Sequence, residues 1–187
     1  MINKRRDWVK KLLLALLSTT LLILLGACGN SDVSTGGSAN STEKKTDATK
    51  AKSTQTEDNS KTINASSQSI NAIGMKVGLG EIKISEEKIE VGININNTTS
   101  KVLNFYPDQG HLVIGDMQLD ANMFMTSGEI GGEVQGGVKQ DAVIEFTAPE
   151  GKTIDVKSVK QIKLIFGDVT SEDFMSSKGV QFNIPVK

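Results

Sequence analysis

From about residue 71 to the end of the chain, apolar and polar residues alternate with a period of two. In residues 89–95, four β-branched apolar residues alternate with Glu90, Gly92 and Asn94. A period of two places successive side chains on opposite faces of an extended chain, so this pattern predicts strands with one buried and one solvated face. Three further segments follow the same pattern, at residues 142–146, 162–166 and 180–186.

Weaker signals complete the predicted set of strands. Val77 and Leu79 share one phase of the alternation, but Ile82 and Ile84 share the other, which predicts a β-bulge near Gly80. Pro185 cannot donate to a ladder of backbone hydrogen bonds, so the last strand is expected to be an edge strand or to end there. The other predicted strands are short, at residues 103–105, 112–114 and 117–123, with a turn at Gly115-Asp116.

Two segments depart from this pattern. Residues 170–177 are predicted to be helical, because Thr170 and Asp173 stand at capping-box spacing and Gly179 supplies a stop signal. Residues 128–137 contain five glycines but lack the Gly-Lys-Ser/Thr ending of a phosphate-binding loop. This second segment is therefore expected to form a bulged hairpin or a mobile loop.

These elements predict an all-β fold, an immunoglobulin-like antiparallel β-sandwich that follows a disordered linker. Several short motifs follow one another in a fixed order over residues 73–186: Asn96-Asn97, Gly115-Asp116, Ser127-Gly128-Glu129, Gly136-Gly137 and Phe146-Thr147-Ala148-Pro149. This order resembles the telokin-like, immunoglobulin-fold domains of uncharacterised lipoproteins from Gram-positive bacteria. The resemblance implies the fold and an extracellular setting, and it supplies no catalytic residues.

The N-terminus has the organisation of a secretory signal peptide. Five basic side chains precede an apolar run from Leu12 to Leu25, which is short for a membrane-spanning helix of ~20 apolar residues. The run closes with Leu25-Gly26-Ala27-Cys28, which resembles the lipobox of bacterial lipoproteins. The resemblance implies that residues 1–27 are removed and that Cys28 is acylated. The alternative is an uncleaved membrane anchor with an unmodified cysteine.

Residues 28–70 are expected to be the lipidated N-terminus and a flexible linker, followed by one domain at residues 71–187. Val33 and Ile63 are nearly the only large apolar residues between Gly29 and Ser69. So polar a segment buries too little surface to offset the entropy of ordering it. An extra ordered strand near Ile63 is the alternative.

The search for chemistry finds no catalytic residue, no metal site and no cofactor site, and the chain is not expected to be an enzyme. His111 is the single histidine, whereas a zinc site needs three or four ligands. Two groups of acids, residues 168–173 and 116–120, are interpreted as solvated turn residues, with calcium binding as the alternative. Tyr106 precedes Pro107, and its ring is expected to face the core rather than to form an exposed apolar tip.

Charge excludes one class of partner. Residues 1–27 hold five of the 21 basic and one of the 22 acidic residues, which leaves a net charge of -5 on the remainder. A domain of that sign has no electrostatic reason to bind nucleic acid.

The expected function is a protein-binding or assembly module in the cell envelope, anchored in the lipid bilayer through Cys28 on the extracellular face of the cell membrane. The alternative is an accessory lipoprotein that binds a small molecule, a wall fragment or calcium.

Overall fold

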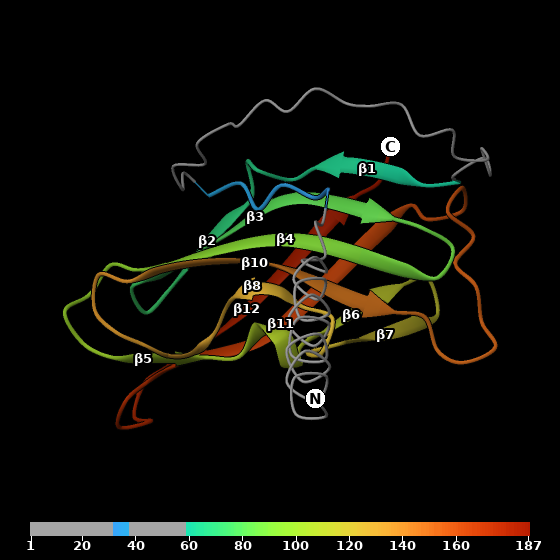
Figure 1. Ribbon diagram of the computed structural model, residues 1–187. Coiled ribbons are helices and arrows are strands. Elements are labelled where there is room, and N and C mark those ends of the chain that lie inside the picture. The colour runs from blue at the N-terminus through green and yellow to red at the C-terminus, as the bar shows by residue number, and fades with distance from the viewer. Residues whose placement is uncertain (1–31, 38–58) are drawn as a thin grey trace, which may run out of the picture. The chain divides into compact units, whose positions relative to one another are not determined.

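The computed structural model describes residues 32–37 and 59–187, which belong to one compact unit. The predicted signal peptide, Cys28 and residues 38–58 of the predicted linker lie outside the described residues. Regular structure in the described part is β apart from one 3₁₀ turn, η1 (Pro107–Gln109), which confirms the all-β class (Figure 1). The strands are β1 (Lys61–Asn64), β2 (Ser69–Ala72), β3 (Met75–Ile84), β4 (Lys88–Asn97), β5 (Leu103–Phe105), β6 (His111–Ile114), β7 (Met117–Ala121), β8 (Ser127–Glu129), β9 (Gly132–Val134), β10 (Lys139–Thr147), β11 (Gln161–Ser171) and β12 (Ser177–Pro185).

The strands form a two-layered antiparallel sandwich, as the alternation predicts. In one layer β3 pairs with β1, β2 and β4, and β4 pairs with β10. In the other layer β11 pairs with β12, β6 and β5. Strand β7 pairs with both β10 and β6, so the hydrogen-bonded path continues from one layer into the other (Figure 1).

The core lies between the layers and is built from the apolar phase of each strand. Ile93 and its alternate neighbours on β4 are fully buried. Three phenylalanines connect the layers: the ring centroid of Phe166 on β11 lies 6.4 Å from that of Phe146 on β10 and 6.3 Å from that of Phe182 on β12. Because the sandwich interior is filled by these side chains, any functional site has to lie on its outer surface.

Two local predictions are confirmed. The register of β3 on β4 shifts between Leu79 and Ile82, which is the predicted bulge. Strand β12 ends at Pro185 and, among the described residues, pairs only with β11, so it is an edge strand.

Three local predictions are wrong. Residues 170–177 form the end of β11, a turn and the start of β12, not a helix, since the buried alternation continues through Val169. The glycine-rich segment is not a hairpin, because β8 pairs with β10 whereas β9 pairs with β5. Tyr106 is 46% exposed, because the alternation of β5 turns Phe105 into the core and the next side chain outward.

The domain also begins earlier than residue 71. The extra strand considered near Ile63 is present as β1, and β2 pairs with β3 from Ser69 onward. Residues 32–37 belong to the same compact unit and run beside β3, the blue segment of Figure 1. The two large apolar residues between Gly29 and Ser69 both pack on the domain: Val33 is buried and Ile63 lies against the core.

Candidate functional site

The predicted lipidation site, Cys28, lies outside the described residues. Among residues 32–37 and 59–187, no helix has both the length and the apolar character needed to cross a membrane.

His111 begins β6, where it is half-buried. Its register partners are Asp120 on β7 and Ile165 on β11. Within the part of the chain that the structure describes, no three His, Cys, Asp or Glu side chains converge to a group that could hold a metal ion. The acids of the two groups interpreted as solvated turn residues, with calcium binding as the alternative, are all exposed: Asp116, Asp120, Asp168, Glu172 and Asp173.

Asp173 has a defined local role in the turn between β11 and β12. Its Oδ1 accepts hydrogen bonds from Ser171 Oγ at 2.6 Å and from the backbone N–H of Met175 at 3.1 Å. These bonds favour the carboxylate, and the bond from Ser171 contributes most to a lowered pKa of Asp173. Asp173, whose spacing from Thr170 predicted a helix cap, therefore stabilises a tight turn instead. Asp side chains bond to nearby backbone N–H groups in both settings.

The same turn presents two large apolar side chains to solvent. Phe174 is 73% exposed and Met175 is 84% exposed. Phe174 also has a φ of +58°, a left-handed conformation that is unusual for an aromatic residue. Strain of this kind persists where surrounding contacts hold it, and it gathers at functional positions.

A second turn, residues 122–126 between β7 and β8, repeats this arrangement. Asn122 Oδ1 accepts the backbone N–H of Phe124 at 3.2 Å, and Asn122 O accepts the N–H of Met125 at 3.0 Å. The three residues after Asn122 are exposed, and Phe124 reaches 91%. We call residues 123–125 and 174–175 together the apolar turns. Sequence reasoning missed them, although Met123-Phe124-Met125 is an apolar run without alternation.

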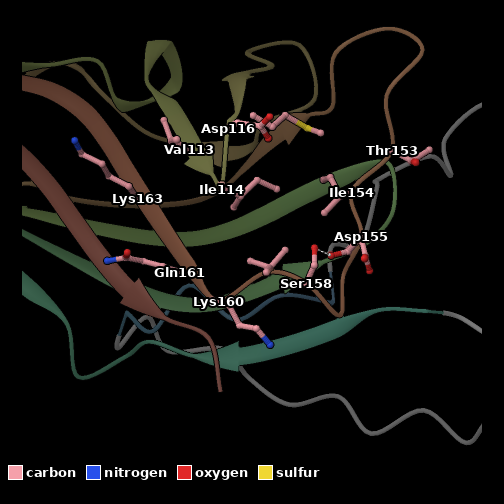
Figure 2. A pocket seen from close by; sticks show the side chains of 13 residues that line it. Val113, Ile114, Asp116, Thr153, Ile154, Asp155, Ser158, Lys160, Gln161 and Lys163 are labelled. Carbon is pink, nitrogen blue, oxygen red and sulfur yellow. Dashed lines mark hydrogen bonds between the residues drawn. The ribbon is translucent and has the colours of Figure 1, made fainter.

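A groove of about 540 Å³ lies between the turn that joins β6 to β7 and the segment at residues 153–161. Figure 2 shows that the amino groups of Lys160 and Lys163 point in different directions, and that Asp155 lies on the side of the groove away from Lys163. A ligand site needs a few polar groups that converge on one point, and these three charged side chains do not.

No protein-family model matches the sequence, and neither does any curated protein. A functionally unknown protein from Listeria monocytogenes EGD-e aligns with a TM-score of 0.50 and 13% identity, over 70% of this chain and 89% of that chain. The GGA1 GAE domain from yeast aligns with a TM-score of 0.37 and 13% identity, over 60% and 92%. A FixG-related protein from Vibrio parahaemolyticus aligns with a TM-score of 0.36 and 14% identity, over 63% and 98%. The likeness to the Listeria protein shows the fold alone.

Proposed function

We propose that this chain is a bacterial lipoprotein, cleaved before Cys28, acylated on that thiol and held at the extracellular face of the cell membrane. Its β-sandwich serves as a protein-binding or assembly module in the cell envelope and not as an enzyme. The observation that carries the anchor is the order of residues 1–28: basic side chains, an apolar run, then Leu25-Gly26-Ala27-Cys28. The single cysteine of the chain stands where acylation requires a thiol, and more than one acyl chain gives stable anchoring.

The apolar turns support a role in binding protein. Each turn exposes two or more large apolar side chains that are neighbours in the sequence, and aromatic residues contribute most to protein interfaces. Each turn is held by its own hydrogen bonds, so little ordering entropy is lost when a partner covers Phe124 or Phe174.

The anchor is tested by lipid labelling in a bacterial host. Cys28→Ala removes the thiol, so labelling with a radioactive fatty acid should be lost, and Ser31→Ala should label as wild type does. Labelling that persists in Cys28→Ala would refute the lipid anchor.

The binding role is tested by crosslinking on intact membranes followed by recovery of the tagged, full-length protein. A partner should be recovered with wild type and with Val138→Ser, which changes an exposed apolar residue outside the apolar turns. Recovery should fall with Phe124→Ser or Phe174→Ser. Equal recovery with all four proteins would argue against the apolar turns, and no specific partner with wild type would argue against the module.

The absence of catalysis is tested by assaying wild type beside His111→Ala on peptide, ester, phosphate and glycan substrates. General acid–base chemistry near neutral pH is done most often by histidine. Turnover by wild type that His111→Ala abolishes would replace the binding role with an enzymatic one.

A further inference from the structure

The outer face of β3 and β4 is shaped to receive an extended piece of chain. Gly80 on β3 and Gly92 on β4 are both buried, although glycine has no side chain to place in the core. A Cβ atom built on either glycine would lie 2.0 Å from the carbonyl oxygen of Ser34, which no real structure tolerates. Glycine inside a strand weakens it, and it is found where another backbone approaches closely.

Hydrogen bonds fix residues 34 and 35 on that face. The backbone N–H of Glu81 donates to Ser34 O at 2.7 Å, and the N–H of Ser34 donates to Glu81 Oε2 at 3.1 Å. Asn94 Nδ2 donates to Thr35 O at 2.8 Å, and Thr35 Oγ1 donates to Asp141 Oδ2 at 3.1 Å. These bonds connect residues 34 and 35 with three strands, β3, β4 and β10.

Apolar burial accompanies these bonds. Val33 is only 7% exposed, yet it is not part of the cluster that fills the sandwich. Val143 on β10 is likewise buried outside that cluster and is the register partner of Gly92. Because Ala142 and Ile144 face the core, Val143 faces the same outer surface as Gly92.

We propose that the outer face of β3, β4 and β10 is a binding site for an extended peptide, and that its occupant is the chain's own segment 32–37, which we call the strap. Its role, which rests on the proposed lipid anchor, is to hold the domain close to the membrane. Four residue steps separate Cys28 from Asp32 and span at most ~14 Å, whatever path they take. With the strap released, the next fixed point is Asn59, and the 31 residue steps from Cys28 to it can span up to ~110 Å.

Docking of the strap is tested on the full chain with Cys28→Ala, so that lipid plays no part. Gly92→Ala should expel the strap, because the three atoms nearest to the new Cβ all belong to Ser34 and Thr35. Hydrogen exchange of the Glu81 amide should then be faster by roughly tenfold or more, since its acceptor is lost. Gly179→Ala, a strand glycine on β12 away from the strap, should leave that amide unchanged.

Val33→Asp loosens the strap without altering the sheet, and it should also speed exchange at Glu81. It keeps the test decisive if Gly92→Ala folds poorly. Exchange at Glu81 that equals wild type in a folded Gly92→Ala and in Val33→Asp would overturn the strap. Protection that disappears on dilution would assign the site to a second copy of the chain and overturn the intramolecular occupant.

The effect on membrane distance is tested with the lipidated protein in phosphatidylcholine vesicles that contain a headgroup-labelled quencher lipid. A fluorophore is attached at Lys76→Cys, an exposed position on the same outer face. Quenching should be strong in the otherwise unchanged protein and with Gly179→Ala, and several-fold weaker with Gly92→Ala. Equal quenching in all three would refute the positioning role. Failure of the lipid anchor gives a different result, with no membrane binding in any variant while the exchange difference persists.

Discussion

The two faces of β4 carry the same number of residues but differ in the kind of residue and in what covers them. Toward the core, β4 presents an unbroken series of β-branched side chains that includes Ile93, all of them buried. Toward the outside it presents Gly92 and Asn94, one of which is buried and the other half-buried by residues 34 and 35. The core face contacts residues that follow the same alternation, whereas the outer face contacts a segment almost sixty positions away, which has no alternation.

This difference shows that a polar face is not always a solvated face. A face of small and polar residues can be covered either by water or by a second stretch of backbone. On β3 and β4, the close approach of Ser34 to Gly80 and Gly92 shows that backbone covers the face. Mutations on the core face should therefore lower the free energy of unfolding by a large amount. Mutations on the outer face should have smaller effects that depend on whether the strap is docked.

The largest effect is expected on the core face. Ile93→Ala removes buried methyl and methylene groups and leaves a cavity, so the free energy of unfolding should fall by about 2–5 kcal/mol. Chemical denaturation of both proteins measures this difference. A loss no larger than that of Asn94→Ala would mean that the core face of β4 contributes no more to stability than the outer face, and it would break the comparison.

The core face was predictable because period-two alternation is a local signal. It located β4, β10, β11 and β12, and the change of phase at Ile82 located the bulge. The outer face was not predictable, because docking of the strap depends on contacts between residues up to 106 positions apart. The signals were present but ambiguous: two glycines inside strands, and Val33 in an otherwise polar segment.

A smaller effect is expected from the charged cluster that Lys88 forms with Glu90 and Glu145 on the outer face. Lys88 Nζ lies 2.7 Å from Glu145 Oε2 and 3.2 Å from Glu90 Oε1, and Glu145 is only 8% exposed. Lys88→Met leaves Glu145 without this partner. Because Lys88 itself is about a third exposed, the cost should be only about 1–2 kcal/mol in the free energy of unfolding near neutral pH.

The pH dependence gives the same cluster a second test. The hydrogen bond to Glu145 is the main cause of a pKa of Lys88 above its ordinary 10.5. A raised pKa in the folded state means that this stabilisation is fully present below pH 10.5 and is lost as the pH rises through the folded value. The difference between wild type and Lys88→Met should therefore shrink at alkaline pH, with Lys83→Met as the control. A difference that grows with pH would contradict the assignment.

Asn94→Ala should cost about 0.5–1.5 kcal/mol, because it removes one hydrogen bond to the strap and nothing from the core. The sharper measurement is a double-mutant cycle with Gly92→Ala. If Gly92→Ala has already expelled the strap, Asn94→Ala should have almost no further effect. Additive losses would mean that Asn94 stabilises the domain by itself, and Asn96→Ala on the same face supplies the reference.

The smallest effect on stability is expected at the apolar turns, which neither pack in the core nor cover the outer face. Phe124 is 91% exposed, and the hydrogen bonds of its turn come from Asn122 and the backbone, so Phe124→Ser removes no packing. The free energy of unfolding should stay within about 0.5 kcal/mol of wild type. Phe146→Ala, the same residue type between the layers, should cost about 3–5 kcal/mol.

Exposure of so large an apolar side chain brings no benefit to folding, so a neutral result points to binding as the reason for Phe124. A loss of 2 kcal/mol or more with Phe124→Ser would instead mean that Phe124 packs against the domain in solution, and it would remove the main support for a protein-binding surface at this turn.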